Sequence, residues 1–311
     1  MTVADLLTTK VTTAPGPKPK DDDLDLFGLT HPGKIRKENQ DHFLLCTVHP
    51  QVVMHGTSLP DPESLPLRGE RIATIMLVAD GVGSGSAGGE ASRLAAETIT
   101  RYVSSTLRCY HAAGSAADRE FLEALRHAAF EAHAAVRSEA VTRSDTKPMA
   151  TTLTLAIAVW PWMYVVQVGD SRCYYFVDGQ LRQVTRDQTM AQDLVDRGVL
   201  PKDRMAASPF SHVLASAIGG EEASPEVTRL DIRRRSCVIL MCSDGLTKHV
   251  SDEEIAGCLG RMESSEQACR ELLDLALERG GSDNITVLAG TARGKPTRDS
   301  AGFHSPGSPA R

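Results

Sequence analysis

The sequence predicts an α+β fold in which helices pack outside antiparallel sheets. Short apolar and β-branched runs, typical of strands, make up much of the chain. They do not alternate regularly with helices: two helical segments follow the first strands, a run of strands comes next, and helices with one closing strand end the pattern. This order argues against a regular βαβ arrangement and favours helices layered on antiparallel sheets.

The individual elements follow from periodicity and from turn residues. Strands are expected at nine places, namely residues 42–48, 72–79, 151–160, 163–168, 172–177, 180–184, 227–232, 237–241 and 284–289. Asp178-Gly179 is typical of a tight hairpin turn between two of these strands. Helices are expected at residues 90–107, 119–140, 188–197, 252–258 and 266–279. Residues 51–69 contain three prolines and two glycines and are interpreted as a loop or hairpin insertion.

Composition divides the 311 residues into one domain between two tails. Residues 1–23 hold prolines, lysines and an aspartate run, so we expect a disordered N-terminal tail. Residues 292–311 are rich in Gly, Ser and Pro and are interpreted as a disordered C-terminal tail. Residues 24–291 then form a single domain of ordinary size.

Charge and hydropathy argue against several classes of function. The net charge of -6 argues against a nucleic-acid-binding protein. The apolar stretch 153–168 is interrupted by Pro161 and is too short to span a membrane, and the N-terminus lacks the pattern of a secretory signal. We therefore expect a cytoplasmic protein that does not bind membranes. The seven cysteines form no CxxC pair, so neither zinc nor redox chemistry is indicated.

Aspartates recur where apolar strands begin or end. Three of them directly follow strands and two precede strands, namely Asp80, Asp170 and Asp244, and Asp41 and Asp283. A single Asp-Gly after a strand is ordinary turn chemistry. Five such aspartates suggest that strands packed together bring the carboxylates together, where they would repel one another unless a cation lies among them. Oxygen ligands without His or Cys favour Mg²⁺ or Mn²⁺, and two such ions can activate water for hydrolysis of a phosphate ester.

Six ordered motifs resemble those of the PPM, or protein phosphatase 2C, family of serine/threonine phosphatases. They are RKENQD at 36–41, VADGVG at 78–83, ATT at 150–152, VGDSR at 168–172, SDGL at 243–246 and GSDNIT at 281–286. Gly28, Thr30, His31 and Gly33 are similar to the opening strand and turn of that family. The resemblance covers nearly all of residues 24–291 and implies a four-layer αββα sandwich with two central antiparallel sheets.

The resemblance also implies the site and its partners. Asp80 would bridge two Mn²⁺ or Mg²⁺ ions, the Gly81 carbonyl would bind one of them, and Asp244 and Asp283 would complete the first metal site. Asp170 matches the residue that holds a third, weaker metal in bacterial relatives. Gln40 and Asp41 would support these ligands without binding the ions directly. Arg36 matches the arginine that binds the substrate phosphate. The implied substrates are phosphorylated proteins, with a cognate Ser/Thr kinase as a partner, and we expect a monomer.

Three positions depart from the family pattern. Gln40 stands where many relatives have Glu, and an amide adds no charge to a metal site. Val82 stands where eukaryotic relatives have a His thought to protonate the leaving group, although bacterial relatives often lack this His. Gln188 stands in place of a usual His, with no consequence that the sequence reveals.

Several motifs argue against other classes of function. Residues 83–88 match the GxGxxG pattern of dinucleotide-binding proteins, but Asp80 lies beside them and no acidic residue follows at the required distance. No cysteine has an arginine six positions later, and no GxSxG elbow is present, which argues against thiol phosphatases and serine hydrolases. The remaining alternative is a catalytically weak or inactive phosphatase-fold protein that binds or regulates. Against it, the four metal-ligand aspartates of the family pattern are all present.

Overall fold

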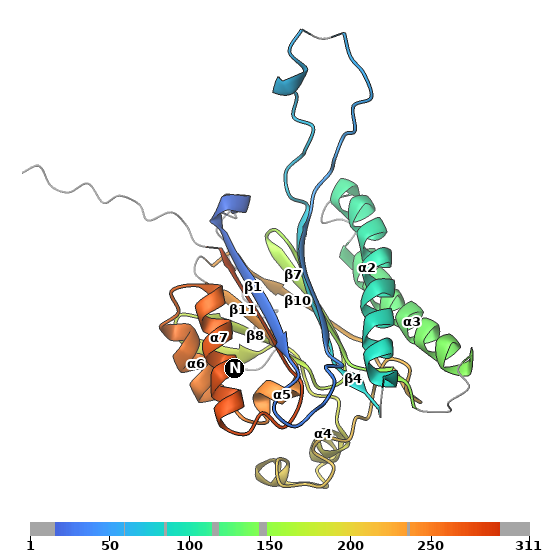
Figure 1. Ribbon diagram of the computed structural model, residues 1–311, viewed down its shortest axis with the longest axis vertical. Helices are drawn as coiled ribbons and strands as arrows, with labels where there is room; N and C mark the ends of the chain where they lie inside the picture. The colour runs from blue at the N-terminus through green and yellow to red at the C-terminus, as the bar shows by residue number, and fades with distance from the viewer. Residues whose placement is uncertain are drawn as a thin grey trace, which may run out of the picture.

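Two antiparallel sheets face each other and are covered by helices on their outer sides (Figure 1). The computed structural model describes residues 16–58, 60–83, 86–113, 118–142, 148–234 and 237–292. The sheets cross the middle of the molecule, with one pair of long helices on one side and a second pair on the other (Figure 1). The predicted α+β sandwich of four layers is therefore confirmed.

The two sheets have five strands each, and every strand pair within them is antiparallel. Sheet I has the order β1 (Leu24–His31), β12 (Ile285–Ala292), β11 (Val238–Cys242), β8 (Arg172–Val177) and β9 (Gln180–Gln183). Sheet II has the order β10 (Glu226–Asp231), β7 (Trp162–Val168), β6 (Leu153–Val159), β3 (Ala73–Ala79) and β2 (His42–Val48). A small third sheet joins β4 (Gly81–Val82) to β5 (Ala150–Thr151).

The helices divide between the two outer faces. The long helices α2 (Ala87–Ala113) and α3 (Asp118–Thr142) contact sheet II. Helices α6 (Asp252–Gly260) and α7 (Ser265–Glu278) contact sheet I, and α5 (Asp244–Thr247) is a single turn after β11. Helix α4 (Met190–Asp196) lies beyond one end of the sandwich (Figure 1). Short 3-10 turns η1, η2 and η4 lie at Asp21–Asp23, Pro62–Ser64 and Lys202–Arg204.

Three separate apolar cores explain why the central strands are hydrophobic without alternation. In β3, Ile75 and Leu77 pack against the helices over sheet II, whereas Met76 and Val78 pack between the sheets. A further core joins sheet I to α6 and α7. Each central strand is thus buried on both faces, so both of its faces carry apolar side chains.

Most expected elements are present, with ends shifted by a few residues. The hairpin predicted at Asp178-Gly179 is confirmed, since Val177 pairs with Gln180 and both turn residues have positive φ, 52° and 75°. Strand β1 was indicated only by the family resemblance, because its half-buried residues give a weak alternation. The segment 51–69 protrudes from the sandwich and is closed by a bridge between Gln51 and Arg68 (Figure 1).

Residues 16–23 differ from the expectation for the N-terminal tail. The Arg71 side chain, only 7% exposed, donates to Asp21 Oδ1 at 2.6 Å and to the Pro19 carbonyl at 2.8 Å. Lys18 Nζ hydrogen bonds to the Arg71 carbonyl. The charged side chains that favour disorder in isolation are here ordered by a buried arginine. Residues 1–15 and 293–311 lie outside the described residues.

The structure also bears on the membrane and dinucleotide hypotheses. None of the helices in the described ranges combines the length and apolar character of a membrane span. The glycine-rich loop leads into α2, which is followed by α3 and not by a parallel strand, and residues 84 and 85 of the loop lie outside the described part. This topology is not a βαβ unit for dinucleotide binding.

Candidate metal centre

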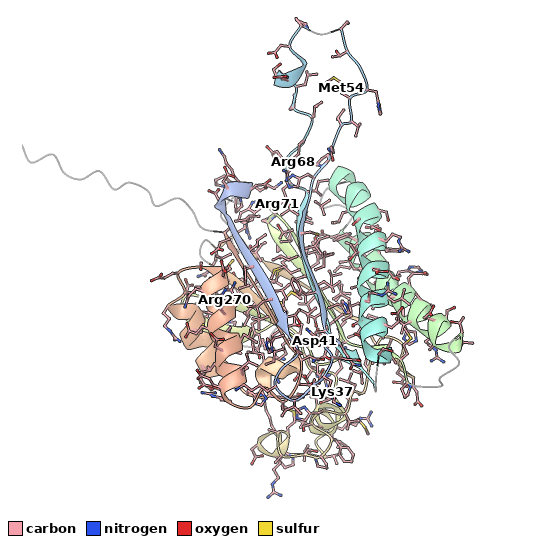
Figure 2. All side chains as sticks on the ribbon, viewed as in Figure 1. Lys37, Asp41, Met54, Arg68, Arg71 and Arg270 are labelled. Carbon is pink, nitrogen blue, oxygen red and sulfur yellow. The ribbon has the colours of Figure 1, made fainter. Side chains whose placement is uncertain are left out.

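Strand register brings the five aspartates to one end of the sandwich. His42 pairs with Ala79, so Asp41 before β2 and Asp80 after β3 lie at the same end of sheet II. Cys242 pairs with Val287, which places Asp244 after β11 near Asp283 before β12 in sheet I. Figure 2 shows Asp41 at the end of the strands close to α4, far from Arg71 at the opposite end.

Asp41 links the two sheets beneath this cluster. Its side chain is buried, and its Oδ2 atom accepts hydrogen bonds from Ser243 Oγ at 2.8 Å and Thr286 Oγ1 at 2.7 Å, both contributed by sheet I. Burial raises the pKa of Asp41 to about 6, although the bonds from Thr286 and Ser243 act in the opposite direction. The neighbouring Gln40 is tied down in the same way, because its backbone N–H donates to Asn284 Oδ1 at 2.9 Å.

Hydrogen bonds to the backbone of Asp80 fix the position of this residue after β3. Its N–H donates to Thr152 Oγ1 at 3.0 Å, and its carbonyl accepts from Thr151 Oγ1 at 2.8 Å. Gly81 is required next, since a Cβ there would lie 2.3 Å from the Gly88 carbonyl oxygen. These contacts explain the ATT and DG motifs physically: they fix one strand end against another.

The other carboxylates act strongly on Asp80. Burial and then the charges of Asp41, Asp244, Asp170 and Asp283 raise its pKa well above the ordinary value. Burial and the charge of Asp244 also raise the pKa of Asp170, to about 8. The structure thus brings together all five aspartates that the sequence singled out, and their mutual repulsion favours a bound cation.

Gln188 fixes the turn that carries Asp170. Gly169 adopts a φ of 99°, and its N–H donates to the Gln188 Oε1 atom at 3.0 Å. Gln188 Nε2 in turn donates to the Ser224 carbonyl at 2.9 Å, and the side chain is buried. The departure that the sequence left without an interpretation therefore has a structural role: this amide serves as acceptor and donor at once.

Two cations of the chain hold Asp283. Arg36 lies 2.7 Å from Asp283 Oδ1 through Nε, and Lys248 Nζ lies 2.7 Å from Oδ2. Burial opposes the ionisation of Asp283, but the hydrogen bonds from Arg36 and Lys248 outweigh it and lower its pKa. Lys248 Nζ also lies 2.6 Å from Asp244 Oδ2. Burial lowers the pKa of Lys248, but the charges of Asp244 and Asp283 exceed this effect and raise it overall.

The oxygen atoms left over fit a hard cation. Asp41 Oδ1 and Asp244 Oδ1 are buried and have no hydrogen-bond partner among the described residues. The Asp41 carboxyl lies close to that of Asp80, but the two can share a hydrogen bond only when one carries a proton. Buried carboxylate oxygens without donors are costly. Carboxylates and a backbone carbonyl are the ligands that Mg²⁺ and Mn²⁺ prefer.

The aspartates do not form a closed cage in the described part of the chain. In the described ranges, no three Asp, Glu, His or Cys side chains are gathered closely enough to hold an ion as they stand. Lys248 contacts both Asp244 and Asp283, and Arg36 contacts Asp283, so these two cations balance part of the carboxylate charge. The donor set of carboxylate and carbonyl oxygens fits a hard metal ion.

The structure adds residues that sequence reasoning did not select. Ser243 and Thr286 stand inside the quoted motifs, but their contact with Asp41 crosses between the sheets. Lys248 follows the SDGL motif by two residues, and its i,i+4 spacing from Asp244 on a helical turn was the available signal. Val82 is 40% exposed and offers no proton donor.

Comparisons with known proteins identify relatives of the chain. A model of protein phosphatase 2C matches residues 67–280. The serine/threonine protein phosphatase PstP of Mycobacterium tuberculosis is 33% identical over 216 residues, which are 70% of this chain and 40% of that protein. The chain therefore spans less than half the length of this relative. The serine/threonine phosphatase stp of Listeria welshimeri is 30% identical over 214 residues, covering 69% of this chain and 82% of that protein.

Solved structures agree with these relatives. The catalytic domain of PstP, crystallised in complex with two manganese ions, superimposes with a TM-score of 0.66 at 26% identity. The match covers 87% of this chain and 99% of that structure. The similarity therefore extends over both sheets and the helices on both sides.

Proposed function

The chain belongs to the protein phosphatase 2C family, and from this we propose that it is a metal-dependent serine/threonine protein phosphatase. It would hydrolyse phosphoserine and phosphothreonine in proteins with water activated at a centre of two Mn²⁺ or Mg²⁺ ions. The observation that carries the proposal is the set of five aspartates at one end of the sandwich, two of which have a buried oxygen without a hydrogen-bond partner in the part of the chain that the structure describes.

The proposed ligands are the residues singled out by the sequence. Asp80 and the Gly81 carbonyl would hold the shared position, Asp244 and Asp283 would complete one site, and Asp170 would hold a third ion. When bound, such ions supply an activated water and neutralise the charge of the phosphate. Gln40, which is anchored through its backbone by Asn284, contributes no charge.

Arg36 is the proposed phosphate-binding residue. Its side chain is 52% exposed, and its planar guanidinium can donate two parallel hydrogen bonds to phosphate oxygens. At present it donates to Asp283, so binding a phosphate requires it to exchange one anion for another. That exchange would place the phosphate beside the metal ligands.

The proposed substrates, partner, cellular location and oligomeric state follow from the family membership. We propose that the substrates are phosphorylated proteins, that a Ser/Thr kinase is the functional counterpart, and that the protein acts as a cytoplasmic monomer. Size-exclusion chromatography with light scattering tests the last point.

Phosphate release from peptides tests the activity directly. We expect turnover of phosphoserine and phosphothreonine peptides, and weaker turnover of phosphotyrosine peptides, with Mn²⁺ and none after metal stripping in excess chelator. Asp80→Asn keeps the shape but removes the shared charge, so kcat should fall at least about a hundredfold, since metal-ion stabilisation is worth several kcal/mol. Asp178→Asn, in the exposed hairpin turn, is the matched control and should remain active. Near-normal, metal-dependent turnover by Asp80→Asn would place the site elsewhere.

One observation favours the alternative of a phosphatase-fold protein with little or no catalysis. Lys248 already neutralises two of the proposed ligands, Asp244 and Asp283. Such a protein would bind phosphopeptides without releasing phosphate at any Mn²⁺ concentration. The peptide assay together with a binding measurement separates the two functions.

A further inference from the structure

Lys248 contacts two of the carboxylates that the proposed metal centre would use, Asp244 and Asp283. Its ammonium nitrogen lies 2.6 Å from Asp244 Oδ2 and 2.7 Å from Asp283 Oδ2. The three side chains are only 16–20% exposed, so solvent screens these contacts weakly. A single side chain thus links the segment just before β12 to the turn that follows β11.

The backbone fixes where this ammonium can reach. Lys248 ends the short helix α5, and its N–H donates to the Asp244 carbonyl at 2.9 Å. This i,i+4 spacing places the side chain on the same face as Asp244. The arrangement therefore does not depend on a flexible loop.

Occupation by lysine is incomplete. Asp244 Oδ1 is buried and has no hydrogen-bond partner within the described ranges, while Oδ2 contacts the ammonium. An ammonium carries its three donors on one nitrogen, and that of Lys248 contacts the Oδ2 atoms of Asp244 and Asp283. A divalent ion carries twice the charge and could bind Asp244 through the oxygen that lysine leaves free, whereas at Asp283 the ion and Lys248 compete for the same carboxylate.

We propose that Lys248 is a tethered counter-ion that takes the place of a metal on Asp244 and Asp283 and is displaced when the ion binds. This inference rests on the proposed metal centre and makes Lys248 a residue that sets metal affinity. It is not assigned contact with the substrate or with the attacking water.

Competition lowers the apparent affinity for metal. If the paired form exceeds the open form about tenfold, only about a tenth of the protein is ready to bind, and the apparent Kd is about tenfold higher than that of the open form. The pairing also protects the metal-free protein from repulsion among its carboxylates. Lys248 therefore stabilises the protein in the absence of metal and raises the metal concentration that is needed for binding.

Calorimetric titration of the metal-stripped protein with Mn²⁺ tests the proposal. We expect Lys248→Gln to bind Mn²⁺ about tenfold more tightly than the natural protein. Lys37→Gln is the matched charge control, because Lys37 is exposed and lies at the same end of the molecule as Asp41 (Figure 2). Its effect should be small and should vanish in about 0.5 M salt, whereas that of Lys248→Gln should persist because the buried pair is poorly screened.

Thermal unfolding gives a second readout that a merely structural lysine would not produce. In chelator, Lys248→Gln should unfold at a lower temperature than the natural protein, because the carboxylates lose their counter-ion. With saturating Mn²⁺ its stabilisation should exceed that of the natural protein, because tighter binding adds stability by linkage. Should Lys248→Gln fail to fold in chelator, Lys248→Met, which keeps the apolar stem, is titrated instead.

The outcomes separate this inference from the proposed function. Tighter binding by the variant, or binding by the variant alone, supports displacement. Equal or weaker binding by Lys248→Gln while the natural protein binds Mn²⁺ overturns the role of Lys248 and leaves the metal centre standing. Absence of Mn²⁺ binding by both proteins overturns the role of Lys248 and the proposed metal centre together.

Discussion

Replacement of Gln188 by leucine tests whether a buried amide holds the Gly169-Asp170 turn. Leucine has a similar size but neither accepts from the Gly169 N–H nor donates to the Ser224 carbonyl. Gly169 is buried, so its N–H would be left without a partner, which costs about 1–3 kcal/mol. Ser224 is exposed and water can replace the lost donor, so this loss adds only about 1 kcal/mol.

The free energy of unfolding should therefore fall by about 2–4 kcal/mol in Gln188→Leu. For a domain of this size that corresponds to a drop in Tm of about 2–4 °C per kcal/mol. Urea unfolding in chelator measures the change without a contribution from bound metal. Gln192→Leu is the control, because the Gln192 amide donates to the exposed Asp196 and not to a buried backbone group. If both variants lost the same small amount, under about 1 kcal/mol, the amide would not anchor the turn.

Two further predictions concern the thiols and the N-terminal segment. Alkylation of the folded protein should leave activity largely intact, because burial raises the pKa of thiols such as Cys237 and Cys258, each to about 11. Mass spectrometry measures the labelling and circular dichroism the fold. Loss of activity on labelling of one cysteine in a protein that stays folded would contradict this prediction. Deletion of residues 1–23 should lower the free energy of unfolding by about 1–3 kcal/mol, because Arg71 loses Asp21 and the Pro19 carbonyl. A deletion that stops at residue 15 keeps both contacts, and equal stability of the two truncated proteins would show that the contacts contribute little.

The sequence predicted the fold well because its signals are local. Strand β2 has the expected bounds, and the Asp178-Gly179 turn lies where its residues require it. The two long helices were predicted too short at both ends, since their first and last turns lack an apolar periodicity. Strand β1 gives little periodic signal because all its residues are only partly buried or exposed.

The sequence likewise reveals some residues of the candidate site and not the contacts that position them. Aspartates at strand ends are visible in the sequence because each lies next to an apolar run. The contacts that fix them are not visible, because Ser243 and Thr286 reach Asp41 across more than 200 positions of sequence. Gln188 could be recognised only as a departure, since its role depends on the turns at Gly169 and Ser224.

The position of Asp41 shows why the two sheets must pack before the site exists. Asp41 and Asp80 lie at the end of sheet II, and Asp244 and Asp283 lie at the end of sheet I, so neither sheet alone would form the proposed metal site. The apolar core between the sheets brings these ends together, and the bonds from Ser243 and Thr286 fix their spacing. Hydrophobic burial is favourable enough to offset the repulsion of the gathered carboxylates. Folding thus assembles an anionic cluster that a cation would stabilise. The ammonium of Lys248 and the proposed metal ions would each neutralise part of its negative charge.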